Sequence, residues 1–234
     1  MRENLFAAKT ISVLKKAFRE YYFNQSKAIE EPLQMQQREF GYMHFGQAGM
    51  LRHLSFKSMK ELDAMLVREA PSDVYCSNAY YRFPTQQPMQ EKQWLGADLI
   101  FDIDGKDLGM PCVPSHSYSV CINCGNASPP QQEEERSSYS CSSCGYKKAD
   151  YVSIPCSKCI DSSKKEARRL IEFLLEDIGL EHSAIQIYFS GNNGFHVHIN
   201  DNACLSLDSQ ARSDLVSYLS GTGLMLESIG VRKT

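Results

Sequence analysis

The stretch that decides the fold of this chain is Ala97-Asp98-Leu99-Ile100-Phe101-Asp102-Ile103-Asp104, an apolar strand pattern with acidic residues at alternate positions. Strand side chains alternate between faces, so Asp98, Asp102 and Asp104 are expected to share one face. A rise of about 3.3 Å per residue allows the carboxylates of Asp102 and Asp104 to converge on one or two Mg²⁺ or Mn²⁺ ions. Such a pair suits phosphoryl transfer. The alternative is a strand end whose acids are merely solvated before the turn at Gly105.

Composition limits the possible functions. The chain has 234 residues, 42% of them hydrophobic, which is enough for one domain or for one domain with a small module. Its 25 basic and 28 acidic residues give a net charge of −3, without the basic excess of a protein that coats nucleic acid. Contact with nucleic acid must therefore be local or shared with a partner. The sequence has no apolar run long enough to span a membrane, and we expect a cytoplasmic protein.

Six of the nine cysteines form three Cys-x-x-Cys pairs, which predicts metal binding in a reducing compartment. The inner site would be Cys121, Cys124, Cys141 and Cys144, and the outer site would be Cys112, His116, Cys156 and Cys159. Each set has the residue types of a tetrahedral zinc site, so two structural Zn²⁺ ions are expected. Four protein ligands leave no open position for a substrate. The alternative is a set of ordinary thiols.

Regular structure is predicted on both sides of the cysteines. Short strands are expected at 38–42 and 51–56, with a helix at 58–69. The pattern Ser163-x-x-Glu166 is typical of a capping box at the start of a helix that stops at Gly179. A hairpin is expected over 185–199, and its polar face, with Tyr188, Ser190, His196 and His198, would lie beside the two aspartates. Asp208 is expected to cap a helix over 209–219.

Several motifs, taken in order, resemble the small catalytic subunit of archaeal and eukaryotic DNA primase, nearer the archaeal form. The motifs are Arg38-Glu39-Phe40, 50–56 (MLRHLSF), 77–81 (SNAYY), 91–92 with 94–104 (EK and WLGADLIFDID), and 189–198 (FSGNNGFHVH). The resemblance covers nearly the whole chain. It implies an α/β fold, with a primase-type catalytic core whose mixed sheet is mainly antiparallel and flanked by helices. It also implies a zinc-binding module, into which the inner cysteines would insert a zinc-ribbon-like element.

The resemblance assigns roles to individual residues. Asp102 and Asp104 would be two of three carboxylates that bind catalytic Mg²⁺ or Mn²⁺. Ser190, Gly191 and His196 would contact the triphosphate, while Arg52, Arg38 and Glu39 would lie near the nucleotide. The core would comprise residues 1–111 and 160–234, and residues 112–159 would form the zinc module.

The implied function is that of a nucleotidyltransferase, a DNA-directed RNA polymerase that makes short primers on single-stranded DNA. It would consume nucleoside triphosphates, pair with a primase large subunit and work in replication, associated with the nucleoid if the chain is archaeal. Two alternatives remain. One is a zinc-containing nucleic-acid-binding or assembly module without catalysis, and the other is a repair polymerase of the same superfamily.

The chain departs from the family pattern in two places. Asn193 stands where the family usually has arginine, which removes one phosphate-binding charge. The family's third carboxylate lies beyond the equivalent of Thr234, and the acids after His198, which are Asp201, Asp208 and Asp214, do not resemble it. We therefore expect a catalytic core that is incomplete at its C-terminus.

Overall fold

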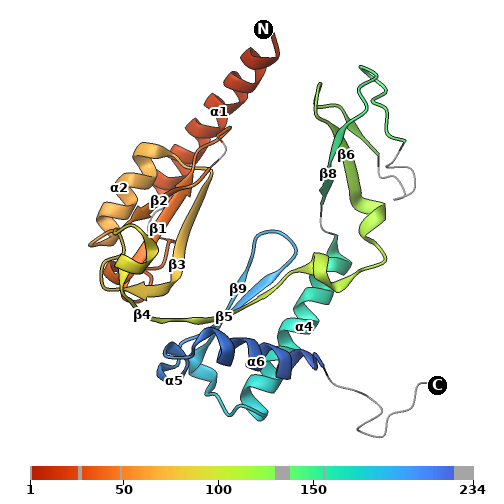
Figure 1. Cartoon of the computed structure of the whole chain (residues 1–234). Helices are drawn as coiled ribbons and strands as arrows, with labels where there is room; N and C mark the ends of the chain where they lie inside the picture. Colours follow the sequence, from red (N-terminus) through yellow and green to blue (C-terminus); the bar gives the residue numbers. More distant parts are fainter. Residues whose placement is uncertain (1, 26–27, 48, 130–137, 155, 224–234) are drawn as a thin grey trace, which may run out of the picture. The chain divides into compact units, whose positions relative to one another are not determined.

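The computed structural model describes residues 2–25, 28–47, 49–129, 138–154 and 156–223. The chain divides into two compact units, Met1–Asp98 and Leu99–Thr234, which are described separately below (Figure 1). Both are built from helices and antiparallel sheets, so the predicted mixed α/β class is confirmed. None of the helices in the described ranges is long and apolar enough to cross a membrane.

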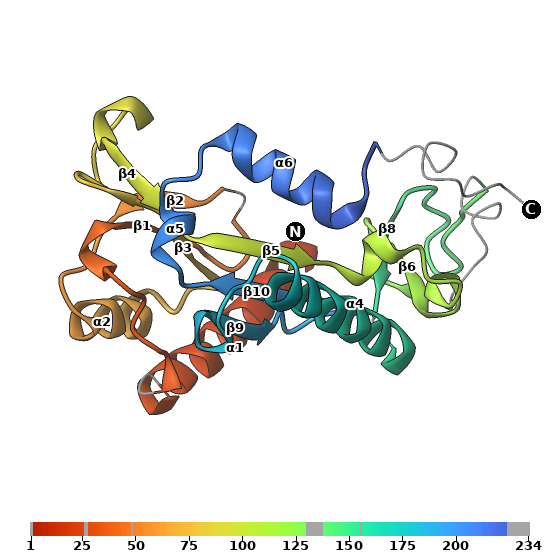
Figure 2. The same ribbon diagram turned by 90° about the horizontal axis from the view of Figure 1, so that it is seen from below.

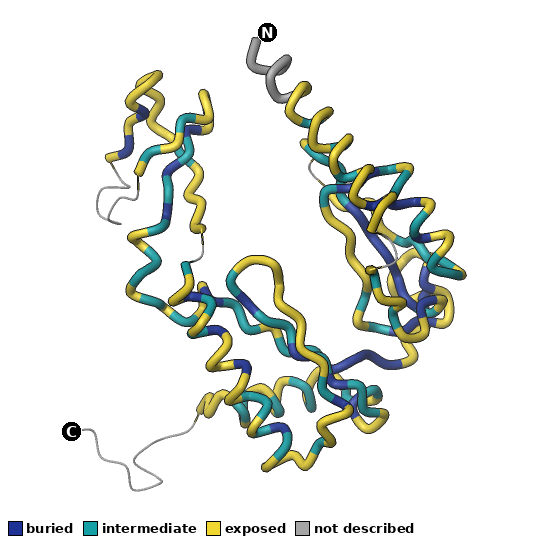
Figure 3. Tube along the Cα trace, turned by 180° about the vertical axis from the view of Figure 1, so that it is seen from behind, coloured by how far each residue is buried: buried dark blue, intermediate teal, exposed yellow. Residues whose placement is uncertain are grey.

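The N-terminal unit is a four-stranded antiparallel sheet with helices packed on it. Its elements are α1 (Arg2–Gln25), η2 (Met35–Gln37), β1 (Arg38–Met43), β2 (Leu51–Leu54), α2 (Met59–Glu69), β3 (Asp73–Tyr81), η3 (Met89–Lys92) and β4 (Trp94–Ala97). The sheet order is β2-β1-β3-β4. β1 is the most buried strand, as Figure 3 shows, and Phe40 packs in one cluster with Leu62 and Leu66 of α2. The predicted strands and helix of this region are confirmed within a few residues.

The C-terminal unit holds two three-stranded antiparallel sheets, β5-β10-β9 and β7-β6-β8. Its elements are β5 (Leu99–Ile103), η4 (Gly105–Leu108), η5 (Val113–His116), β6 (Ser117–Cys121), β7 (Ala127–Ser128), β8 (Ala149–Ser153), α4 (Ser157–Glu176), η6 (His182–Ala184), β9 (Ile185–Phe189), β10 (Phe195–Ile199), α5 (Asn202–Leu205) and α6 (Ser209–Ser220). α4 lies along the first sheet (Figure 2), where Leu174 packs with Val197 and Ile199, all fully buried. The predicted hairpin is confirmed, and Asp208 caps α6 by accepting the Ala211 N–H at 2.8 Å.

The strand expected to run without a break from residue 97 to 104 is interrupted at Asp98, which corrects the prediction that Asp98 shares a face with Asp102 and Asp104. β4 pairs with β3 in one sheet, whereas β5 pairs with β10 in another. The Asp98 N–H donates to the Asn78 carbonyl at 2.8 Å, and its carboxylate pairs with Arg38 at 2.6 Å. These partners hold Asp98 in the interior of the N-terminal unit. Asp98 therefore does not continue the strand that carries Asp102.

The predicted capping box at Ser163 is also wrong. α4 begins at Ser157, with Cys156 at the N-cap, so Ser163 lies inside the helix. The Ser163 side chain is fully buried, which a solvent-facing cap would not be. The hydroxyl therefore has a different partner, described below.

Candidate metal and nucleotide sites

Asp102 lies on the polar face of the sheet, at the end of β5. Its register partner across the ladder is His196 of β10, and the two side chains approach to 3.5 Å between Oδ1 and Nε2. The Asp102 side chain is 69% exposed. β10 also brings His196 opposite Tyr188 of β9, so the polar face expected beside the aspartate is present. An exposed carboxylate next to an imidazole is open to a cation or a ligand from solvent.

Asp104 caps the helical turn η4 directly after the strand. Its carboxylate accepts the Lys106 N–H at 3.0 Å and lies 2.6 Å from Lys106 Nζ. Hydrogen bonds from the Lys106 side chain and then from its backbone lower the pKa of Asp104, outweighing the small effect of burial. Asp104 is therefore ionised well below neutral pH, as a metal ligand must be.

A cavity of 520 Å³ opens beside these two carboxylates. Asp102 of β5 and Asp104 directly after it line the cavity, together with other residues of β5 and residues of η4, α4 and α6. The charged and aromatic members of that wall from α4 are Glu166, Arg169 and Phe173. The volume is in the range of small-molecule sites.

The turn between β9 and β10 is held in one shape by Ser190. Its hydroxyl oxygen accepts the N–H groups of Gly194 at 3.1 Å and Asn192 at 3.4 Å. Since both bonds use oxygen lone pairs, the hydroxyl proton can be donated to a ligand. Gly191 has φ +81°, a conformation that favours glycine. The turn thus presents a donor near the end of β5.

Asp107 and Glu166 line the same cavity, but among the described residues no group of three ligand atoms that includes Asp102 and Asp104 lies within 4.8 Å. The three later acids considered in the sequence have local partners. Asp201 accepts the Ala203 N–H at 2.8 Å, Asp208 caps α6, and Asp214 accepts from Gln210 at 2.8 Å. None of these three later acids is grouped with Asp102 and Asp104 as a set of metal ligands.

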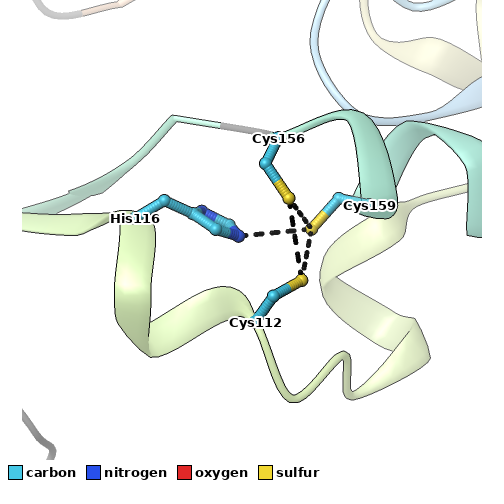
Figure 4. Close-up of side chains that lie close together, drawn as sticks. All are labelled: Cys112, His116, Cys156 and Cys159. Atoms are coloured by element: carbon cyan, nitrogen blue, oxygen red, sulfur yellow. Dashed lines mark hydrogen bonds between the residues drawn. The ribbon is translucent and has the colours of Figure 1, made fainter.

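The outer cluster brings Cys112 and His116 together with Cys156 and Cys159 (Figure 4). The sulfurs lie 3.4 to 3.9 Å apart, and His116 Nε2 is 3.3 Å from Cys159 Sγ. Tetrahedral zinc thiolates would place their sulfurs roughly 3.7 Å apart, given Zn–S distances near 2.3 Å. His116 Nδ1 contacts Ser153 Oγ at 3.2 Å, the outer-shell bond that orients a metal-binding imidazole.

The inner cluster forms at the tip of the sheet β7-β6-β8. Cys121 lies 3.6 Å from Cys144, and Cys124 lies 3.5 Å from Cys141. Burial alone would raise the pKa of Cys141, but the N–H groups of Ser143 and Cys144 contribute to lowering it to about 6. Thiolates are the form that binds metal. Both predicted ligand sets are therefore assembled by the fold.

The N-terminal unit holds the other predicted residues, Arg38, Glu39 and Arg52. The Arg38 side chain is buried and donates to Asp98, Tyr80, Ser77 and Leu33. The Arg52 side chain is 51% exposed and bonds Glu39 at 3.2 Å through Nε. Arg52 thus presents part of its guanidinium to solvent, while Arg38 is occupied by groups of the protein.

Lys92, for which the sequence predicted no role, contacts the carboxylate of Glu39. Its side chain is fully buried, with Nζ 3.4 Å from Glu39 Oε2 and bonded to the Pro84 carbonyl. Burial would raise the pKa of Glu39, but the His53 N–H, Lys92 and Arg52 together lower it. A lone lysine in a polar segment gives no sequence signal for burial, because only the folded neighbours provide its partners.

Known proteins with similar sequences align with nearly the whole chain. A family model described as DNA primase small subunit matches residues 149–229. The chain is 45% identical over 223 residues to the DNA primase small subunit PriS of Nitrosopumilus maritimus, covering 95% of this chain and 57% of that protein. The corresponding protein of Cenarchaeum symbiosum is 41% identical over the same shares, and that of Methanothrix thermoacetophila is 36% identical over 96% of this chain and 48% of its own length. The chain spans about half the length of these curated relatives.

Proposed function

We propose that this chain, which is similar to archaeal DNA primase small subunits over 95% of its length, carries a primase catalytic core. The reaction would be nucleotidyl transfer, which builds short RNA primers on single-stranded DNA from nucleoside triphosphates. The observation that carries the proposal is the placement of Asp102 and Asp104 at one strand end, with His196 opposite Asp102 and the Ser190 turn on the neighbouring strands.

Asp102 and Asp104 are proposed to hold Mg²⁺ or Mn²⁺. Both offer the hard oxygen ligands that these ions prefer, and Asp102 is open to solvent. Such ions, when bound, would lower the pKa of the attacking 3′-hydroxyl and neutralise the triphosphate and its leaving group. The resemblance also implies a third carboxylate ligand, and among the described residues no assembled group of three ligands includes Asp102 and Asp104.

The remaining site residues are proposed to bind and orient the triphosphate. Ser190 would donate its hydroxyl proton to a phosphate oxygen, since its lone pairs already accept from the turn. His196 would lie between that turn and Asp102, and Gly191 would allow the backbone to approach the phosphates.

In the N-terminal unit, Arg52 is proposed to contribute phosphate contacts through its exposed guanidinium. Glu39 would orient Arg52 through its hydrogen bond to Arg52 Nε. Arg38 donates to Tyr80 and Asp98, so it would stabilise the sheet rather than bind the nucleotide.

We assign Zn²⁺ to both cysteine clusters, because thiolate and imidazole ligands in closed sets of four suit that ion. The proposed organisation is a core of residues 1–111 and 160–234, with the zinc module of 112–159 inserted into it. Metal analysis of the purified chain should find two zinc ions per molecule. Cys112→Ser and Cys141→Ser should each remove one, and a zinc-free chain would refute both sites.

A primase large subunit is proposed as the partner. The net charge of −3 gives the chain no overall attraction for single-stranded DNA, so a partner would supply part of the template contact.

One observation favours a second candidate function. Because Asp102 and Asp104 belong to no assembled group of three ligands among the described residues, the second candidate is a zinc-containing nucleic-acid-binding or assembly module without catalysis. In that case, binding of single-stranded DNA would not depend on Asp102 or Asp104.

Primer synthesis on single-stranded DNA decides between these functions. The chain should incorporate labelled nucleotides with Mn²⁺ or Mg²⁺, alone or with the large subunit of a related archaeon. No product under either condition, together with DNA binding that survives Asp102→Asn and Asp104→Asn, would refute the enzyme and support the binding module.

A further inference from the structure

The buried hydroxyl of Ser163 joins α4 to the turn between β9 and β10. Ser163 Oγ donates to the Asn193 carbonyl at 2.6 Å and also lies 3.1 Å from the Cys159 carbonyl, one helical turn earlier. The residue has 0% exposure. A helix of this length does not need a serine at this place, because serine favours helices less than alanine does. The hydroxyl therefore serves a contact between elements.

The same carbonyl oxygen receives a second bond from the end of β5. The Gly105 N–H, directly after Asp104, donates to the Asn193 oxygen at 3.2 Å. A carbonyl oxygen has two lone pairs, and both are used here. Three segments that carry proposed site residues thus meet at one atom of Asn193.

Two glycines show how closely these segments approach. A Cβ on Gly105 would lie 2.7 Å from the Asn193 oxygen and 3.0 Å from Ser163 Oγ. A Cβ on Gly194 would lie 2.5 Å from the Ile103 oxygen. Because a backbone oxygen lies within 3 Å of the Cβ position at each of them, neither glycine can carry a side chain without a shift of the turn or of the chain at the end of β5. The Ser163 bond also limits the movement of the turn.

The outer cluster closes a ring through this junction. From Asp104 the chain runs through η4 to Cys112 and His116, which meet Cys156 and Cys159 at the start of α4. α4 then reaches Ser163 one turn after Cys159. The cluster and the bonds of Ser163 and Gly105 to the Asn193 oxygen therefore close one ring, and Asp104 lies directly next to that ring in the chain.

We propose that Ser163 is a positioning residue that couples the outer metal cluster to the phosphate-binding turn 190–194. It holds the Ser190 donor at a fixed place relative to Asp104, and it transmits the constraint that the cluster imposes on α4. This inference rests on the proposed function, because it concerns the turn that would bind the triphosphate.

The test is nucleotide affinity in Ser163→Ala, with Ser162→Ala as the matched control on the same helical turn. Alanine preserves α4, so the variant should fold and retain both zinc ions. The dissociation constant of a fluorescent ATP analogue with Mg²⁺ should rise about 5- to 10-fold, the change expected for one lost hydrogen bond. Amide exchange at Gly105 should accelerate, while Ser162→Ala should match the unmodified chain in both measurements.

Coupling to the cluster is tested by combining Ser163→Ala with Cys112→Ser. If the two closures belong to one ring, the double variant should lose less affinity than the product of the two single losses. Independent, multiplicative losses would overturn the coupling.

The outcomes separate this inference from the proposed function. Unchanged affinity and unchanged Gly105 exchange in Ser163→Ala, in a chain that binds the analogue, would overturn the positioning role alone. A lower unfolding stability with unchanged affinity would reduce Ser163 to a packing residue and would also overturn it. If the unmodified chain binds no nucleotide, the proposed function fails and this inference fails with it.

Discussion

Asp98 and Asp102 stand four residues apart in one apolar run, yet the fold gives them opposite environments. The Asp98 side chain is 9% exposed and paired with Arg38 at 2.6 Å, whereas the Asp102 side chain is 69% exposed and lies 3.5 Å from the imidazole of His196. A carboxylate that already has buried partners stabilises the fold, and one without them remains free to take a cation. The difference shows that tertiary neighbours, rather than residue type, decide which acid can do chemistry.

The buried acid lies in a complete polar network. Asp98 accepts from Arg38 and from the Tyr80 hydroxyl, and the Arg38 guanidinium lies over the Tyr80 ring at 4.2 Å from its centroid. Burial raises the pKa of Tyr80, and its bond to Asp98 raises it further, so the phenol remains a donor. Such a network is stable only while every member has its partner.

The largest expected effect is on catalysis at the exposed acid. If the proposed primase core is active, Asp102→Asn should lower primer synthesis about 10⁴-fold, equivalent to about 5.5 kcal/mol, because the proposed metal site would lose a charged ligand. Its unfolding free energy should stay close to that of the unmodified chain, since the side chain is largely exposed. Labelled-nucleotide incorporation and urea unfolding measure the two effects. Asp161→Asn, an exposed change on α4, is the control, and an active Asp102→Asn variant would contradict the metal role.

Asp98→Asn should show the reverse pattern. Leaving the buried Arg38 charge without its partner should cost about 3 to 5 kcal/mol of unfolding free energy. Urea unfolding, followed by the circular dichroism signal, measures this loss. The double variant Arg38→Met with Asp98→Leu should recover part of it, because no charge is then left unpaired. If Asp98→Asn keeps the unfolding free energy of the unmodified chain, the buried pair of Asp98 with Arg38 does not stabilise the fold more than the exposed Asp102 does.

Glu39 extends the comparison to pH. Its pKa is lowered from the usual 4.5, so the stability that its ionised form contributes is complete above that value and is lost as pH falls through the lowered pKa. The unmodified chain should therefore lose stability more steeply than Glu39→Gln as pH falls below 4.5. Urea unfolding over a series of acidic pH values gives the two slopes. Equal slopes would mean that Glu39 contributes no ionised pair.

The smallest effect is expected at Arg52, the exposed member of the Glu39 group. Arg52→Ala should change the unfolding free energy by about 0.5 kcal/mol or less, as for most surface changes. The KM for nucleotides should rise about tenfold if its guanidinium contacts phosphate, through loss of a charge-assisted bond of about 1.5 kcal/mol. Arg52→Lys should recover part of the affinity. An unchanged KM would leave Arg52 a surface residue.

The sequence predicted most elements because their patterns are local. The alternation of residues 185–199 was enough to predict the hairpin and its polar face, and the cysteine spacing predicted both ligand sets. Two predictions failed where a distant partner intervened. The strand breaks at Asp98 because Arg38 and Asn78 bind it, and Ser163 lies inside α4 because the helix begins at the outer cluster.

By itself, the sequence determined the strand and helix periodicity, the similarity to DNA primase small subunits, and the residue types able to bind metal. Only the tertiary structure decided that Asp98 is interior while Asp102 is open, that Lys92 is buried under Glu39, and that Ser163 bonds Asn193. The physical reason is that periodicity is set by neighbours along the chain. Burying a charge or a hydroxyl, by contrast, is stable only when a partner arrives from far away in the sequence.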